Sequence, residues 1–167
     1  MRISAMLAGA TLIALLPVAT TAQDGNRLRD AREQAPAALI GHWKADLAAS
    51  TYTGNKPQAA TRSFAYTEGG RVLVSFATLT ASGALTSGHW AAQVDGTPAI
   101  EYHSSAGAIA YNVVSFRKLD ERTLSLTVTR HGKLDLEARY QLAADGRTLT
   151  YSYDGNSIVY RPWNLVD

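Results

Sequence analysis

The sequence predicts an all-β fold, a single up-and-down antiparallel β-barrel of about 8–10 strands. Three observations support this prediction. Apolar and polar residues alternate along most of the chain after residue 39, Gly-containing turn signals recur at short intervals, and no Gly-rich phosphate loop stands between a strand and a helix. A chain of 167 residues suffices for one domain and is too short for two cores of ordinary size.

The composition narrows the classes of function. Lys and Arg number 16 against 14 Asp and Glu, which gives a net charge of +2. So small a charge attracts phosphates poorly, and we expect no nucleic-acid partner. The sequence contains no cysteine, which excludes disulfides, thiolate catalysis and Cys-ligated zinc.

Residues 1–22 have the three-part pattern of a secretory signal peptide. Arg2 supplies a positive charge, residues 5–16 form an apolar run, and Thr20 and Ala22 place small residues before a cut at Gln23. The run is shorter than the ~20 residues that a membrane span needs. The alternative is a retained anchor, but no basic stop-transfer cluster follows. We therefore expect a periplasmic or extracellular protein with no stable membrane span after cleavage.

The next segment, residues 23–39, is a polar leader. Asn26 could cap a short helix over residues 27–34, which Pro36 would end, and a disordered leader is the alternative. The barrel domain is expected to occupy residues 40–167. Its ten predicted strands cover residues 40–46, 61–68, 71–80, 85–94, 97–103, 109–119, 122–130, 133–143, 147–154 and 157–162.

The hairpin around His131-Gly132 can be tested for register. A two-residue loop would pair Val128 with Asp135, whereas a three-residue loop centred on Gly132 pairs Val128 with Leu136. Only the second register keeps the apolar residues on one face, because a slip of one residue inverts every side chain. We therefore predict a three-residue loop with a left-handed glycine.

Closure into a barrel would remove the two exposed edges of such a meander. A flat sandwich is the alternative, but it favours longer connections between its sheets. The only long loop before the final strand is residues 47–60, between the first two strands.

Gly41-His42-Trp43 opens the first predicted strand, and Tyr160-Arg161-Pro162 ends the last one. This pair of motifs resembles the calycin signature of lipocalins, and the chain is similar to small exported bacterial lipocalin-like proteins. Further matching segments are Arg62-Ser63-Phe64, Asp95-Gly96, Phe116-Arg117-Lys118-Leu119-Asp120 and Asp145-Gly146-Arg147-Thr148. The resemblance implies that Gly41 and Trp43 help to close one end, that Arg161 stacks across Trp43, and that the barrel holds a small apolar molecule.

The aromatic residues of the strands are the candidate ligand-binding residues. They are Phe64, Tyr66, Phe76, Trp90, Tyr102, Tyr111, Tyr140 and Tyr151. Core packing is the alternative role for each of them. Tyrosine suits a pocket wall because its ring is apolar and its hydroxyl can orient a polar group. The expected partner is thus a small hydrophobic molecule bound non-covalently, with no cofactor; the oligomeric state is open.

Glu101 and His103 are weak catalytic candidates. Residues two apart on a strand share a face, so the carboxylate and the imidazole can couple as orienter and base. They would serve a small isomerase, cyclase or hydrolase, which is one alternative function. A filled barrel that acts through its outer surface is another. We expect no metal site, since pairing residue 88 with 103 would place His89 and His103 on opposite faces. The scattered cations, Arg62 among them, are predicted to be solvated.

Overall fold

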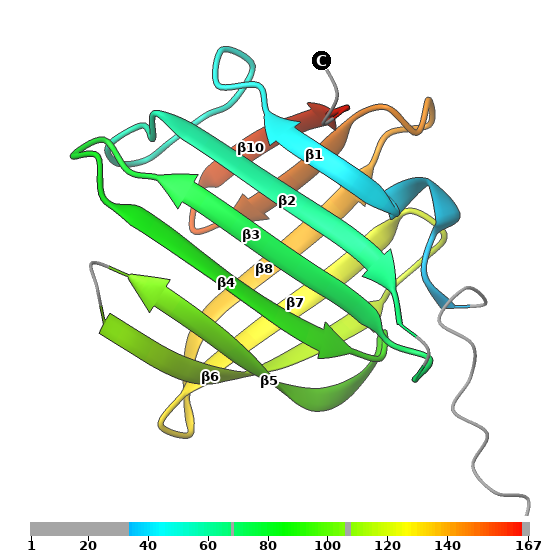
Figure 1. The fold of residues 1–167 in the computed structure, drawn as a ribbon. Coiled ribbons are helices and arrows are strands. Elements are labelled where there is room, and N and C mark those ends of the chain that lie inside the picture. The colour runs from blue at the N-terminus through cyan, green and yellow to red at the C-terminus, as the bar shows by residue number, and fades with distance from the viewer. Residues whose placement is uncertain (1–33, 68, 106–107, 165–167) are drawn as a thin grey trace, which may run out of the picture.

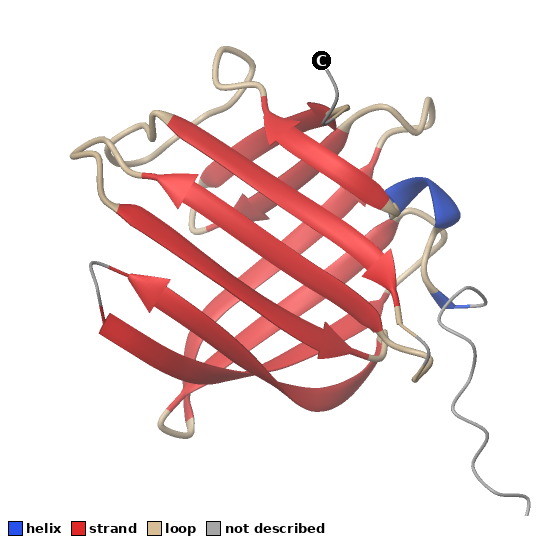
Figure 2. Cartoon of the chain, viewed as in Figure 1, coloured by secondary structure: helices blue, strands red, loops and turns tan. Residues whose placement is uncertain are grey.

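The computed structural model describes residues 34–67, 69–105 and 108–164, and nearly all of its regular structure is strand (Figure 2). The strands are β1 (Gly41–Ala45), β2 (Ala59–Tyr66), β3 (Val72–Leu79), β4 (Leu85–Ala92), β5 (Asp95–Ser105), β6 (Ala108–Lys118), β7 (Thr123–Arg130), β8 (Lys133–Leu142), β9 (Leu149–Tyr153) and β10 (Asn156–Pro162). Each predicted strand boundary lies within two residues of the observed one.

The ten strands form one closed barrel, as predicted. Each strand pairs antiparallel with its neighbour in sequence, and β1 pairs with both β2 and β10. In Figure 1, β1–β4 form the front of the barrel, β7–β9 form the back, and β5 and β6 join the two below. Closure pairs each described strand with a neighbour on both sides, although β4 and β5 pair only over Thr86–Trp90 and Glu101–Ser105. The alternating strands therefore direct one side chain in two to the inside of the barrel.

The β7–β8 hairpin confirms the predicted register and corrects the predicted loop. Val128 pairs with Leu136, but the loop has two residues, His131 and Gly132, whose φ angles are 51° and 73°. Two positive φ angles are typical of a type I′ turn. The register is restored by a bulge, because Thr129 pairs with Leu134 and leaves Asp135 without a partner on β7. The apolar pattern thus determines the register, and the bulge absorbs the extra residue.

One end of the barrel is packed with apolar side chains. A short 3₁₀-helix, η1 (Ala37–Leu39), precedes β1 and places Leu39 at 0% exposure. Trp43 lies beside it, also buried, and its Nε1 donates to the Leu39 carbonyl oxygen at 2.9 Å. Other large, fully buried side chains of the core are Trp90, Tyr140, Tyr160, Phe64, Phe116, Leu124 and Leu149.

Arg161 does not take the position that the resemblance implies. Lys44 pairs with Arg161 across β1 and β10, so Trp43 and Arg161 point to opposite faces of the barrel wall. Arg161 lies on the outer surface, where its Nη1 donates to Thr148 Oγ1 at 2.6 Å and its Nε lies 3.5 Å from an Asp46 carboxylate oxygen. Closure comes instead from backbone pairing and from Trp43. Gly41 begins β1 at a φ of 139°, a value that favours glycine.

The predicted signal peptide, residues 1–22, and the expected helix as far as residue 33 lie outside the described residues. The end of the leader belongs to the core, because Ala35 and Leu39 are both buried in it. Within the described part of the chain, no helix is long and apolar enough to cross a membrane.

Candidate functional site

The end of the barrel opposite Leu39 is hollow. Two open cavities of about 490 and 340 Å³ adjoin there, sharing Arg62, Thr78, Tyr151 and Tyr153 as wall residues. The larger one lies under the β1–β2 loop and the β3–β4 turn, both at the left of Figure 1. The smaller one extends between β4–β6 and β7–β8. The barrel is therefore neither empty nor filled throughout, but packed at one end and hollow at the other.

Five of the eight candidate ligand residues form one interior aromatic cluster. Tyr140 contacts Phe64 edge-on, with 5.5 Å between ring centroids, and stacks on Tyr151 at 4.6 Å. Phe76 and Trp90 also belong to the cluster, and their ring centroids lie 6.2 Å apart. Phe76, Trp90 and Tyr151 line the smaller cavity, whereas Phe64 and Tyr140 lie beneath it in the core.

The other three candidates lie elsewhere. Tyr66 packs at the closed end, where its hydroxyl donates to the Ala35 carbonyl oxygen at 3.5 Å. Tyr102 and Tyr111 pair across β5 and β6 on the outer surface, with exposures of 54% and 68%. They point outward because the alternate positions of β5 point inward, as the buried Glu101 shows. Tyr102 and Tyr111 therefore do not line the interior.

Arg62 lies inside the barrel, so the expectation of a solvated side chain is wrong. It occupies the inward face of β2, two residues from Phe64, and this spacing is the sequence signal that identifies it. Its guanidinium carbon lies 4.0 Å from the Tyr151 ring centroid. Nη1 donates to Tyr140 Oη at 2.7 Å and Nε donates to Tyr160 Oη at 3.3 Å. A cation enclosed by aromatic rings in this way gains cation–π stabilisation.

The phenols of Tyr140 and Tyr151, beside Arg62, stay neutral over a wide pH range. Burial raises the pKa of Tyr140 well above its ordinary value and raises the pKa of Tyr151 to about 12, against an opposing influence of the Arg62 charge. Tyr153, at the mouth, also has a raised pKa, with burial as the main cause. The guanidinium keeps its positive charge because arginine does not deprotonate in proteins. The tyrosines thus supply polar contacts but no negative charge.

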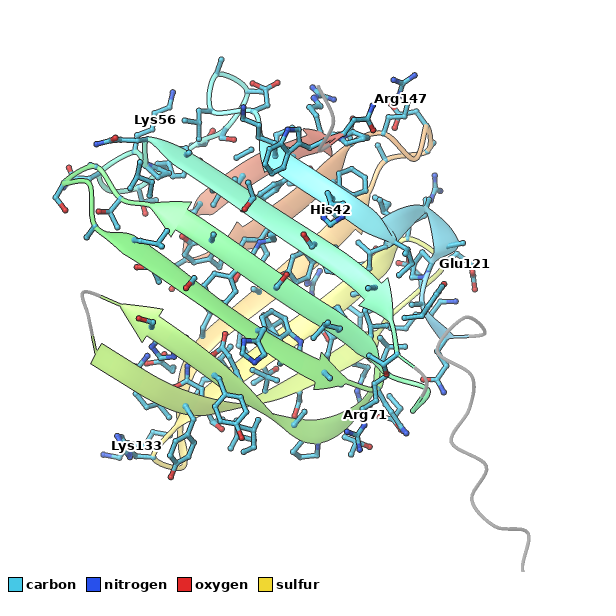
Figure 3. The ribbon with its side chains drawn as sticks, in the orientation of Figure 1. His42, Lys56, Arg71, Glu121, Lys133 and Arg147 are labelled. Atoms are coloured by element: carbon cyan, nitrogen blue, oxygen red, sulfur yellow. The ribbon has the colours of Figure 1, made fainter. Side chains whose placement is uncertain are left out.

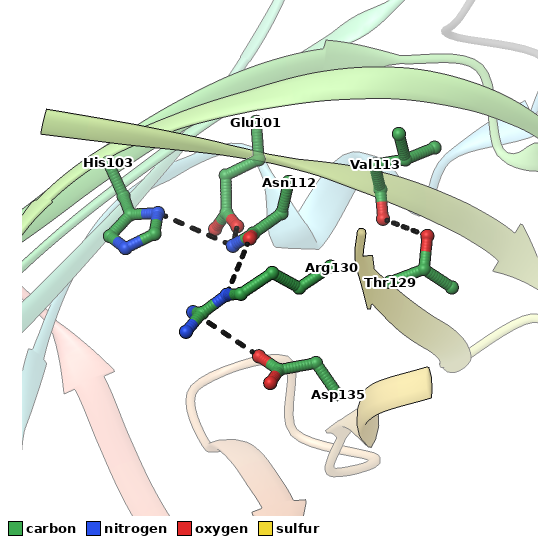
Figure 4. A network of polar contacts seen from close by, with 7 residues as sticks. All are labelled: Glu101, His103, Asn112, Val113, Thr129, Arg130 and Asp135. Atoms are coloured by element: carbon green, nitrogen blue, oxygen red, sulfur yellow. Dashed lines mark hydrogen bonds and ion pairs between the residues drawn. The ribbon is translucent and has the colours of Figure 1, made fainter. Parts of the chain in front are cut away.

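A second polar group lines the smaller cavity and contains both catalytic candidates (Figure 4). Glu101 and Asn112 are buried, with exposures of 6% and 4%. Asn112 Nδ2 donates to Glu101 Oε2 at 2.6 Å and lies 3.3 Å from His103 Nδ1. Arg130 Nε donates to Asn112 Oδ1 at 3.1 Å, and Arg130 Nη2 lies 3.4 Å from an Asp135 carboxylate oxygen. The bulge in β8 frees Asp135 for this contact.

The donors and acceptors of this group fix its chemistry. Arginine can only donate, so Arg130 holds the oxygen of Asn112 and turns its amide nitrogen toward Glu101 and His103. In this orientation the amide nitrogen of Asn112 faces His103 Nδ1 as a donor. Glu101 does not contact His103 directly. The arrangement orients a buried carboxylate and an imidazole toward one cavity but does not couple them as base and orienter. Asn112 was missed, although its spacing from Val114 and Phe116 places it on their inward face.

The histidines do not converge. Gly88 pairs with His103 and His89 pairs with Tyr102, as expected, so the two imidazoles lie on opposite faces. His89 stacks on Tyr102 outside the barrel, and His42 Nδ1 lies 2.8 Å from Ser63 Oγ. Among the described residues, no group of three or more His, Asp or Glu side chains could hold a metal ion.

A hollow of about 920 Å³, larger than either cavity at the open end, opens on the outer surface where β4 and β5 separate beyond the pair of Trp90 and Glu101. Its wall includes Arg71, His89, Asp95 and Lys118 together with apolar side chains. Cations such as Lys56, Lys133 and Arg147 likewise project from the periphery (Figure 3). The two cavities at the open end lie inside the barrel and bring Arg62 and the buried Glu101 to their walls, so they form the candidate site.

Comparison with known proteins adds no family name. No protein-family model matches the chain, and no curated protein matches it. The closed antiparallel barrel is compatible with a lipocalin-like fold, although lipocalin barrels have eight strands and this one has ten.

Proposed function

We propose that the protein binds a small molecule non-covalently in the open end of its barrel. The observation that carries this proposal is the pair of adjoining cavities, about 490 and 340 Å³, in a barrel whose other end is tightly packed. Small-molecule sites have volumes of roughly 300–1,000 Å³ and combine apolar walls with a few convergent polar groups. The rings of Phe76, Tyr151 and Tyr153 supply such walls here.

We further propose a lipocalin-like protein that works outside the cytoplasm, in the periplasm or the extracellular space. The support is the signal-peptide pattern of residues 1–22 and the motifs around Trp43. The lack of cysteine is compatible with export, because the barrel closes through backbone pairing of β1 with β10 and needs no disulfide.

The polar groups of the open end refine the expected ligand. A purely hydrophobic molecule would displace water from Arg62 and Glu101 without offering either charged group a polar partner, which costs free energy. The ligand that fits has an apolar part, which contacts the aromatic rings, and at least one polar group.

A small barrel enzyme is the second candidate, because Glu101 and His103 line the same cavity. In that case Glu101→Gln would leave binding intact and stop turnover. The variant would then accumulate its unreacted substrate. This bound molecule would differ in mass from the one held by the wild type. The same bound mass in both proteins would favour pure binding.

Native mass spectrometry of the protein purified from its own periplasm tests the binding proposal. We expect a population heavier than the polypeptide under gentle conditions, which disappears on denaturation. Thr78 lines both cavities, so Thr78→Trp should fill the space and abolish this population. Thr61→Trp, on the outward face of β2, is the matched control and should retain it. No heavier species, or one that survives Thr78→Trp, would contradict the proposal.

A further inference from the structure

Arg62 is a charged residue inside the barrel without an acidic partner. Arg62 is half-buried, and an arginine side chain is seldom withdrawn from solvent unless it is paired. No carboxylate lies within 4.0 Å of Arg62 among the described residues. Its contacts are aromatic: the rings of Phe76, Tyr140, Tyr151 and Tyr160 lie 4.0–5.8 Å from its guanidinium carbon. The barrel therefore positions a cation but does not neutralise it.

The guanidinium also has unused hydrogen-bond donors. It carries five N–H groups. One is used by Tyr140 and one by Tyr160, and the others have no partner among the described residues. Each phenol oxygen accepts from Arg62, so its own O–H is available as a donor. Tyr160 and Arg62 both line the larger cavity, and together they can offer several donors to one acceptor group there.

The charges of the two cavities differ. Arg62 is the only charged side chain among the described residues that line the 490 Å³ cavity. The 340 Å³ cavity also contains Glu101, Arg130 and Asp135, of which Arg130 and Asp135 pair with each other. Glu101 would repel an anion from the smaller cavity. An anion entering the larger one meets the unpaired cation alone.

We propose that Arg62 is an anion subsite, which binds the oxyanion head, carboxylate or phosphate, of an amphiphilic ligand whose apolar part lies along Tyr151 and Tyr153. This inference rests on the proposed function and specifies its ligand. The two oxygens of such a head match the fork of a guanidinium, and these charge-assisted bonds are among the strongest in proteins. The neutral tyrosines leave the cation uncompensated until the ligand arrives.

Calorimetric titration with decanoate, decyl phosphate and decan-1-ol tests the subsite, because the three share a chain and differ in the head group. For the wild type we expect one or both anions to bind about 10- to 100-fold more tightly than the alcohol. The stronger anion identifies the head group. Arg62→Met should abolish this preference without abolishing alcohol binding. The matched control is Arg147→Met, which removes an exposed cation that lines neither cavity.

The outcomes separate the two proposals. Equal binding of anion and alcohol to the wild type, or a preference that survives Arg62→Met, would overturn the subsite and leave the binding cavity standing. No binding of any of the three, with no co-purified molecule, would overturn both. A second measurement uses only the wild type, in case the variant misfolds. The carboxyl resonance of isotope-labelled decanoate should titrate at lower pH when bound than when free, and an unchanged titration would contradict the contact with Arg62.

Discussion

Replacing Asn112 by alanine should destabilise the barrel through its neighbours. The amide of Asn112 is 4% exposed and holds Glu101 at 2.6 Å on one side and Arg130 at 3.1 Å on the other. Removing it leaves the Glu101 carboxylate, itself 6% exposed, without this hydrogen-bond donor. The variant thus creates a stranded buried charge as well as a small cavity.

The expected loss is about 2–4 kcal/mol at neutral pH. A hydrogen bond to a charged group contributes about 1.5–3 kcal/mol, and a buried charge that loses its partner costs about 3–5 kcal/mol when it stays ionised. Cavity water and the second contact of Arg130, to Asp135, reduce the upper figure.

Urea denaturation followed by tryptophan fluorescence measures this loss. Asn55→Ala, in the exposed β1–β2 loop, is the matched control and should change stability by less than about 0.5 kcal/mol. The double variant Asn112→Ala with Glu101→Leu should be more stable than Asn112→Ala alone, because it removes both partners. The reasoning is refuted if Asn112→Ala unfolds like the wild type, or if the double variant is no more stable than Asn112→Ala alone.

Four further results are expected. Burial raises the pKa of Tyr151 from 10.0 to about 12, so about 2–3 kcal/mol of the free energy of unfolding should be present below pH 10 and lost as pH rises toward 12. In alkaline denaturation, Tyr151→Phe should lose less of its free energy of unfolding than the wild type does. Gly88→Ala should destabilise the protein by about 1–3 kcal/mol, since the added Cβ would lie 2.7 Å from the Phe76 ring and 2.8 Å from a backbone oxygen. An unchanged melting temperature in thermal unfolding would contradict this. His131→Asn should raise stability by about 0.5–1 kcal/mol, because asparagine tolerates a φ of 51° better, and equal melting temperatures would argue against a strained turn. Trp43→Ala should cost about 3–5 kcal/mol, and Arg161→Ala less than about 1 kcal/mol, in urea; similar losses would restore the expected Trp–Arg closure.

The strands and the two registers that were predicted, those of β7–β8 and β4–β5, followed from the strict period of two in the alternation. The pairing of Val128 with Leu136 followed from the apolar pattern alone, although the pattern could not distinguish a longer loop from a tight turn followed by a bulge. The outward position of Arg161 could not be predicted. It depends on how β1 pairs with β10, which are far apart in sequence and meet only when the barrel closes.

Part of the site was within reach of the sequence. Arg62 lies on the same strand face as Phe64, and Tyr102 lies on the opposite face of its strand from Glu101 and His103. The alternation of side chains along a strand therefore assigns each of them to the inside or the outside of the barrel. The contact between Asn112 and Arg130 was beyond such reasoning, because it joins β6 to the end of β7 through side-chain rotamers. The division into a packed end and a hollow end depends on how side chains fill the whole barrel.

The most direct test of a binding site in the open end is a map of backbone amide shifts as decanoate is added to isotope-labelled protein. The account predicts shifts concentrated at wall residues such as Thr78 and Tyr153, with Leu124 and Leu142 in the packed core unmoved. Shifts centred on the outer hollow near His89, or none at saturating ligand, would contradict it.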